Sequence, residues 1–206
     1  FVFLKNSEKK ISENLYLEIF SLKENKFQRG VALMRPGSAY IDFYKGYVFI
    51  ASTIGIIGFG RLGKMVYEYA KSFDMNILIY DIDENSVLGF ENHVIDFDGL
   101  IKSSDVITLH PKLNETSFEM INRRSIKLMK DGVIIINTSR GDVINSEDLL
   151  SSLESGKVGF AALDVLKNEF HSGKLPNDPL IEYALDQNNS DKILITPHAG
   201  GATLDA

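Results

Sequence analysis

Three polar residues able to take part in catalysis follow apolar runs that are typical of buried strands. They are Arg140, Asp164 and His198, and Glu169 lies five residues after Asp164. Ligands of open α/β sheets bind beyond the carboxyl ends of the strands, so these side chains should gather on one side. A guanidinium can orient a carboxylate substrate, and an imidazole near a carboxylate can transfer protons. Each residue alone could equally be a surface arginine, a solvated acid, or a capping or core histidine, so only their joint order points to catalysis.

A glycine string, Gly58-Phe59-Gly60-Arg61-Leu62-Gly63, connects a predicted strand at Thr53–Ile57 to a predicted helix at 62–73. In a dinucleotide fingerprint the first glycine permits a tight turn and the second lets backbone amides approach a pyrophosphate. The third lets helix and strand pack closely, while the helix N-terminus presents N–H groups to the anion. A glycine-rich turn without any ligand would have the same residues, so the string alone does not establish binding.

An acidic residue at the next strand end supports the dinucleotide interpretation. Asp81 follows a predicted strand at Asn76–Tyr80 and lies eighteen positions after Gly63, near the spacing of a carboxylate that binds the adenosine ribose. Such a carboxylate repels a 2′-phosphate and therefore favours NAD over NADP. The alternative is an ordinary turn residue, and Asp83 takes the role if the register slips by two.

From Thr53 onward, apolar runs alternate with helical patterns, which predicts an α/β fold with a doubly wound parallel sheet of the Rossmann type. The helix at 62–73 is expected to bury one apolar face, made of Leu62, Val66, Tyr69, Ala70 and Phe73. The segment 173–189 is expected to be a polar surface excursion. In the first fifty residues only an amphipathic helix at 12–23 is predicted. The other predicted elements are strands at 93–95, 106–109, 133–136, 159–163 and 193–196 and helices at 97–102 and 147–154, the last capped by Asn145 or Ser146 and stopped by Gly156.

The composition limits the possible functions. The chain has 206 residues, 44% of them hydrophobic, which is enough for a substantial core. Its formal net charge of -6 argues against a nucleic-acid surface. The absence of cysteine excludes disulfides, thiolate catalysis and cysteine-bound metals, and it fits a reducing, cytoplasmic setting; no metal site is expected. The longest apolar stretch, 48–59, is too short to span a bilayer, and the first residues do not resemble a secretion signal.

Four motifs in order resemble the D-isomer-specific 2-hydroxyacid dehydrogenases: 54–63, 136–141, 161–165 and 196–201. The resemblance covers residue 53 to the C-terminus and leans slightly toward phosphoglycerate-dehydrogenase-like members. It implies an NAD-dependent enzyme that passes hydride between the nicotinamide and a 2-hydroxy or 2-keto acid. By the resemblance, Arg140 binds the substrate carboxylate and polarises the keto oxygen. His198 is the general acid in reduction and the general base in oxidation, Glu169 pairs with it, and Asp164 contacts the nicotinamide end.

The cofactor contacts implied by the motifs are Gly58, Gly60, Arg61, Leu62, Gly63, Asp81, His110, Pro111, Thr116, Thr138, Ser139, Asp164, His198 and Gly200. Family members also have a substrate-binding lobe, which is expected to be largely missing from this chain. We therefore expect 1–50 to be an arm or a remnant of that lobe and 51–206 to be the NAD-binding domain. Such a chain is expected to bind NADH with little or no turnover and to form a homodimer. The alternatives are an NAD(H)-sensing protein of the corepressor type and an inactive fragment that only dimerises.

Overall fold

The computed structural model describes residues 31–33, 42–44, 52–167, 178–189 and 191–198. The chain divides into two units, Phe1–Phe49 and Ile50–Ala206. In the first unit, β1 (Val31–Leu33) pairs antiparallel with β2 (Asp42–Tyr44). The predicted helix at 12–23 lies outside the described residues.

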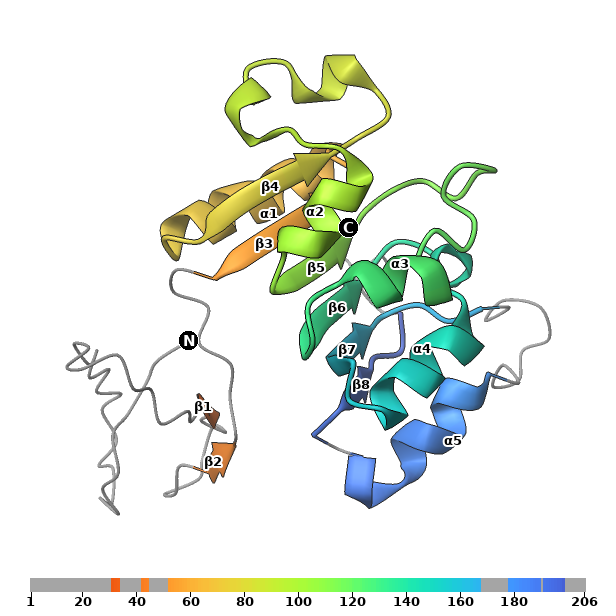
Figure 1. The fold of residues 1–206 in the computed structure, drawn as a ribbon. Helices are drawn as coiled ribbons and strands as arrows, with labels where there is room; N and C mark the ends of the chain where they lie inside the picture. Colours follow the sequence, from red (N-terminus) through yellow and green to blue (C-terminus); the bar gives the residue numbers. More distant parts are fainter. Residues whose placement is uncertain (1–30, 34–41, 45–51, 168–177, 190, 199–206) are drawn as a thin grey trace, which may run out of the picture. The chain divides into compact units, whose positions relative to one another are not determined.

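The second unit is built on a parallel sheet of six strands in the order β4-β3-β5-β6-β7-β8 (Figure 1). The chain passes from β3 outward to β4 and then returns to β5 on the other side of β3, which creates a topological switch point. The predicted Rossmann fold is confirmed. The strands are β3 (Thr53–Ile57), β4 (Asn76–Tyr80), β5 (Val106–Leu109), β6 (Val133–Asn137), β7 (Val158–Leu163) and β8 (Ile193–Ile195).

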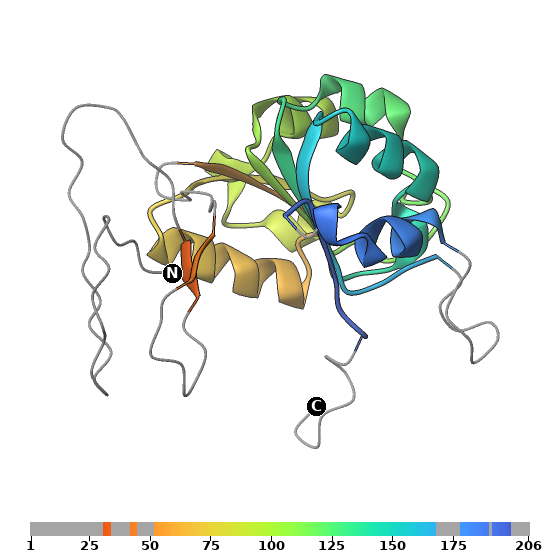
Figure 2. The same cartoon turned by 90° about the horizontal axis from the view of Figure 1, so that it is seen from below.

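Helices lie on both faces of this sheet (Figures 1 and 2). Among the described helices, α1 (Arg61–Ser72) packs against β3 and β4 on one face. The opposite face carries α2 (Phe97–Ser103), α3 (Arg123–Leu128), α4 (Ser146–Glu154) and α5 (Pro179–Leu185). Their buried side chains form one core with alternate residues of the strands. Four short 3-10 helices complete the described part: Glu84–Val87, Glu91–His93, Gly141–Val143 and Gln187–Asn189.

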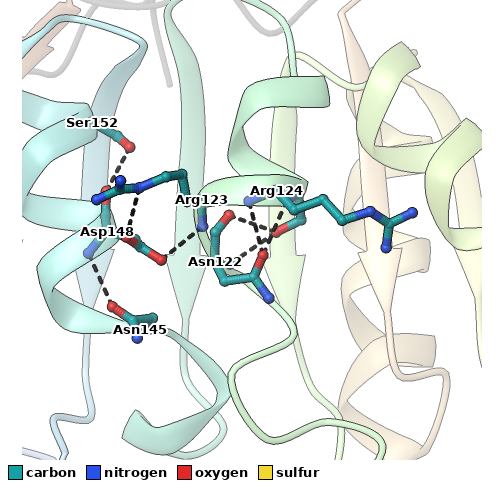
Figure 3. A network of polar contacts seen from close by, with 7 residues as sticks. Asn122, Arg123, Arg124, Asn145, Asp148 and Ser152 are labelled. Carbon is teal, nitrogen blue, oxygen red and sulfur yellow. Dashed lines mark hydrogen bonds and ion pairs between the residues drawn. The ribbon is translucent and has the colours of Figure 1, made fainter.

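A polar network joins the N-terminal ends of α3 and α4 (Figure 3). Asn122 caps α3, and the following Arg123 donates to Asp148 of α4 through its backbone N–H at 2.8 Å and its Nε at 3.3 Å. Asn145 accepts from the backbone N–H of Asp148 at 3.0 Å, which confirms Asn145 as the cap of α4. Gly156 ends that helix with φ of 76°, as its position predicts. The short helix α3 was not predicted.

The predicted buried face of α1 was wrong. The helix buries Gly63, Tyr67 and Ala70, because the first of these must lie directly on the glycine turn. Of the five residues expected to face the core, only Ala70 is fully buried and Val66 is half-buried. The others, with Met65, form what we call the exposed stripe of α1: Leu62 (56% exposed), Met65 (51%), Tyr69 (62%) and Phe73 (42%).

Two further predictions are corrected. The segment 93–95 is not a strand: the 3-10 helix Glu91–His93 occupies its start, and only Val94 bridges to Ile79. The segment 173–189 is not wholly a surface excursion, because it contains α5. There Asp178 is 6% exposed, caps the helix through the N–H of Leu180 at 3.0 Å and accepts from Ser146 Oγ of α4 at 2.7 Å. Polar composition concealed a short helix that buries Leu180 against α4.

Candidate cofactor site at the carboxyl edge of the sheet

Most of the predicted site residues follow the carboxyl ends of the six strands. We call this region the carboxyl edge, defined by Gly58 after β3, Asp81 after β4, His110 after β5, Thr138 and Arg140 after β6, Asp164 after β7 and His198 after β8. Because the six strands are parallel, their carboxyl ends lie on one edge. Thr138, Arg140, Asp164 and His198 follow three strands that are neighbours in the sheet, β6, β7 and β8.

The three glycines of the turn are required for different reasons. Gly58 has φ of 88°, and a Cβ there would lie 2.5 Å from the backbone N of Pro111. A Cβ at Gly63 would collide with the carbonyl oxygen of Gly58. At Gly60, however, a Cβ would meet no described atom within 4 Å, and φ is -73°. The turn and its packing therefore account for two glycines, whereas Gly60 keeps a surface clear.

That clear surface lies at the N-terminus of α1. Gly60 is the N-cap and supplies no side-chain hydrogen bond, and the first turn contains no acidic residue. The N–H groups of a twelve-residue helix therefore point to a region that no capping side chain of α1 fills. Such an N-terminus favours an anion, and a Cβ at Gly60 would stand in its approach. The arrangement fits a pyrophosphate.

The carboxylate of Asp81 is held beside this turn. Its Oδ2 accepts from the backbone N–H of Phe59 at 2.6 Å, and its Oδ1 accepts from the N–H of Asp83 at 2.8 Å. The turn itself is tied to the same strand end, because Gly58 N–H donates to the carbonyl of Tyr80 at 2.9 Å. Each oxygen keeps a second lone pair that can accept from a ribose hydroxyl. Asp81 rather than Asp83 therefore lies against the glycine turn.

His110 lies at the switch point, on the opposite side of β3 from Asp81. Its Nε2 is 2.9 Å from Thr108 Oγ1 and its Nδ1 is 3.4 Å from Thr138 Oγ1. Burial lowers the pKa of the imidazole to about 4, because desolvation disfavours the charged form. The ring is therefore neutral at physiological pH and links the ends of β5 and β6.

A residue that sequence reasoning missed shapes the loop carrying Arg140. The side chain of Asn137, which is 1% exposed, accepts from Ser139 N–H at 3.0 Å and from Ser139 Oγ at 2.9 Å. It also donates to the carbonyl of Arg140 at 2.9 Å, while the Arg140 side chain donates to the Ser139 carbonyl at 2.6 Å. The available signal was an amide placed directly after three isoleucines of a buried strand.

The ends of β7 and β8 are joined at the carboxyl edge. Thr196 Oγ1 donates to Asp164 Oδ1, and the Thr196 N–H donates to the carbonyl of Leu163 at 2.9 Å. Two residues later His198 is half-buried and has φ of 51°, a left-handed backbone that is uncommon for residues other than glycine. This pairing places the chain that leads to His198 beside Asp164.

The segment that follows β7 is held in place at Leu166 and Lys167. A Cβ at Gly141 would collide with the backbone of Leu166, so the segment after β7 lies directly on the Arg140 loop. Lys167 Nζ is 2.9 Å from Glu119 Oε1, and this hydrogen bond raises the pKa of the Lys167 amine and lowers that of the Glu119 carboxyl. Lys167 also lies 5.7 Å from the ring centroid of Phe118. Glu169 and Gly200 lie outside the described residues.

Three other predicted cofactor contacts lie on the surface. Arg61 and Leu62 are exposed at the start of α1, and Thr116 is exposed on the loop after β5, where its Oγ1 donates to Asn114 at 2.7 Å. Ile82, which was not predicted, directly follows Asp81 and is 61% exposed, so it is an apolar surface available beside the carboxylate. The sequence signal that could have identified Ile82 is an apolar residue between two acidic ones, Asp81 and Asp83. In the described part of the chain, no group of three histidine or acidic side chains could hold a metal, and no helix is long and apolar enough to cross a membrane.

Comparisons with known proteins agree with this geometry. The family model for the D-isomer specific 2-hydroxyacid dehydrogenase NAD binding domain matches residues 25–200. A hydroxypyruvate reductase of Thermotoga maritima is 38% identical over 186 residues, which are 90% of this chain and 54% of that protein. A D-3-phosphoglycerate dehydrogenase of Archaeoglobus fulgidus is 32% identical over 188 residues, or 90% of this chain and 32% of that protein.

Solved structures give the same result. The structure of D-lactate dehydrogenase from Aquifex aeolicus, complexed with NAD and lactic acid, has a TM-score of 0.64 and 34% identity, covering 76% of this chain and 49% of that one. The chain thus spans about half the length, or less, of these relatives. Three observations support one conclusion: the glycine turn at Gly58–Gly63, the Asp81 carboxylate after β4, and the family-model match over residues 25–200. This chain belongs to the D-isomer specific 2-hydroxyacid dehydrogenase family, of which it contains the NAD-binding domain.

Proposed function

We propose that the chain is the cofactor lobe of an NAD-dependent D-2-hydroxyacid dehydrogenase. Gly58, Gly60 and Gly63 with the N-terminus of α1 would hold the pyrophosphate, and Asp81 would accept the adenosine ribose hydroxyls. The other proposed cofactor contacts are Arg61, Leu62, His110, Pro111, Thr116, Thr138, Ser139 and Gly200. Hydride transfer to or from a 2-keto or 2-hydroxy acid is the chemistry that the bound nicotinamide would supply. The absence of cysteine supports a reducing, cytoplasmic setting.

The proposed catalytic roles follow from side-chain chemistry at the ends of β6, β7 and β8. Arg140 would bind the substrate carboxylate in a bidentate manner and polarise the keto oxygen. His198 would deliver a proton to that oxygen during reduction and remove it during oxidation, with Glu169 orienting the imidazole. Asp164, held by Thr196, would contact the nicotinamide end. Asn137 supports the proposal because it braces the Ser139–Arg140 turn from a buried position.

One observation carries the cofactor assignment. Gly60 has an ordinary φ and room for a Cβ, so neither backbone strain nor packing against described residues explains a glycine there. Approach of an anion to the N-terminus of α1 does explain it.

Titration of the chain with NADH, followed by nicotinamide fluorescence, tests the proposal. Saturable binding of NADH to the wild-type chain, with weaker binding to a Gly60→Val variant of unchanged stability, is the expected result. Gly156→Ala is the control for adding a Cβ at an open glycine position: Gly156 lies between α4 and the start of β7, at the opposite end of the strands from the carboxyl edge. With φ of 76° this change should cost stability but leave NADH affinity unchanged. A wild-type chain that binds no NADH, or a Gly60→Val variant that binds as tightly as wild type, would refute the proposal.

The proposal also covers the rate of 2-keto acid reduction and the oligomeric state of the chain. We propose that this chain reduces 2-keto acids slowly or not at all, since it spans about half of its relatives and the substrate needs a second wall. The test is a panel of 2-keto acids with NADH, in which robust reduction by this chain would refute slow turnover. The exposed stripe of α1 supports a homodimer, because Leu62, Met65 and Tyr69 lie at helical spacing and each is more than half exposed. An NAD(H)-sensing role of the corepressor type is the second candidate, distinguished by association that depends on NADH.

A further inference from the structure

Phe59, between the first two glycines of the turn, is fully buried. It is 0% exposed, and its ring lies edge-on to two other rings: Phe90 at 4.8 Å and Tyr67 at 5.9 Å between centroids. Tyr67 also contacts Phe90 at 5.0 Å and His93 at 5.4 Å. We call Phe59, Tyr67, Phe90 and His93 the aromatic lock. Edge-to-face pairs of this kind add to the stabilisation from burial itself.

The aromatic lock connects three parts of the carboxyl edge. Phe59 belongs to the glycine turn, Tyr67 to α1, and Phe90 and His93 to the segment that follows Asp81. Hydrogen bonds anchor the lock to β4, since His93 Nδ1 lies 3.2 Å from the Ile77 carbonyl and His93 Nε2 lies 3.2 Å from Tyr67 Oη. On the outer side, Lys64 Nζ lies 5.8 Å from the Phe59 ring and 5.9 Å from the Phe90 ring.

The backbone of Phe59 holds the ribose-binding carboxylate. Its N–H donates to Asp81 Oδ2 at 2.6 Å, so the same residue that is clamped by the aromatic lock also orients the acid. A hydrogen bond from an amide to a carboxylate is among the stronger ones in proteins, but it orients the acid only if the amide itself is held still. The buried ring of Phe59 supplies that restraint.

We infer that the aromatic lock, acting through the Phe59 amide, fixes the Asp81 carboxylate and so makes Phe59 a determinant of selectivity between NAD and NADP. The inference rests on the proposed cofactor site. A carboxylate held at a fixed position opposes a 2′-phosphate strongly, because it cannot turn away from the added negative charge. A carboxylate released from the Phe59 amide keeps only the Asp83 N–H on Oδ1, at 2.8 Å, so its Oδ2 can turn away from the phosphate. Phe59, Tyr67, Phe90 and His93 are thus positioning residues that act through Asp81.

The test measures NADH and NADPH dissociation constants for the wild-type chain and for Phe59→Ala. Phe59→Ala is expected to raise the dissociation constant of NADH by about tenfold and that of NADPH by less. The ratio of the NADPH constant to the NADH constant, which measures selectivity for NAD, should therefore fall by about fivefold to tenfold. Phe97→Ala is the matched control: it removes a partly buried ring from an edge-to-face pair outside the lock, with Tyr80 at 5.5 Å, and it should leave the ratio within about twofold of wild type.

A double-mutant cycle with Asp81→Ala separates selectivity from ordinary packing. If the lock acts through Asp81, Phe59→Ala changes the ratio only when the carboxylate is present. Should Phe59→Ala fail to fold, Phe90→Ala removes the half-buried member and should shift the ratio in the same direction by a smaller factor. Equal weakening of both cofactors, or a ratio shift that persists without the carboxylate, would overturn the inference. A wild-type chain that binds neither cofactor would instead refute the proposed function, and the inference with it.

Discussion

The neutral imidazole of His110 leads to a quantitative prediction about stability and pH. Its folded pKa of about 4 is below the ordinary value of 6.5, so the unfolded chain takes up the proton first as the pH falls. The free energy of unfolding should therefore decrease as the pH is lowered from about 6.5 to about 4. Between pH 7.5 and pH 5 the decrease from this one group is about 2 kcal/mol, as each unit of pKa shift corresponds to about 1.4 kcal/mol.

The perturbation is His110→Gln, which keeps a polar side chain between Thr108 and Thr138 and removes the titrating ring. Urea unfolding of both proteins at pH 7.5, 6.0 and 5.0 gives the difference in free energy at each pH. Carboxyl groups titrate in both proteins, so their contribution cancels in that difference. The wild-type chain should lose about 2 kcal/mol relative to the variant between pH 7.5 and pH 5.

An NMR titration of the His110 ring protons gives an independent measurement, with a midpoint near pH 4 expected. A difference curve that is flat with pH, together with a midpoint near the ordinary value for histidine, would show that the ring is solvated and that burial between β5 and β6 does not keep it neutral.

The remaining predictions concern the glycine turn, the ion pair between Lys167 and Glu119, and the exposed stripe of α1. Gly60→Ala should change stability by less than about 0.5 kcal/mol, whereas Gly63→Ala should destabilise by about 1–3 kcal/mol because its Cβ collides with backbone; thermal unfolding of both separates the two roles. Lys167→Glu should lower stability by about 1 kcal/mol, and adding Glu119→Lys should restore most of it; no recovery in urea unfolding would show that this partly exposed pair contributes little. If the chain dimerises through the exposed stripe, Tyr69→Glu should yield monomers in analytical ultracentrifugation with NADH affinity unchanged, and unaltered dimers would refute that interface.

Much of the fold could be predicted because its signals are local. Apolar runs of four to six residues, glycines at strand ends and capping residues such as Asn145 each specify a nearby backbone state. All six strands of the parallel sheet coincide with predicted runs to within one residue. The α-helices that were missed are α3 and α5, of six and seven residues, and α5 begins at a proline in a polar segment that was interpreted as a surface excursion.

The buried face of α1 was wrong for a different reason. Periodicity identifies an apolar face but not which face meets the sheet, and Gly63 and Ala70 bring α1 close while larger residues stay outside. The strand predicted at 93–95 failed similarly, because Val94 alone bridges to Ile79. Pairing between distant segments is a tertiary property that no local pattern encodes.

The candidate site divides in the same way. The residue types and their order along the chain, from the glycine string through Asp81 and Arg140 to His198, are determined by sequence alone, because each follows a recognisable strand. Which strands are neighbours, that Phe59 N–H holds the Asp81 carboxylate, and that burial keeps His110 neutral were decided only by the tertiary structure. Hydrogen bonds and desolvation depend on distances between residues far apart in the chain, and only folding sets those distances.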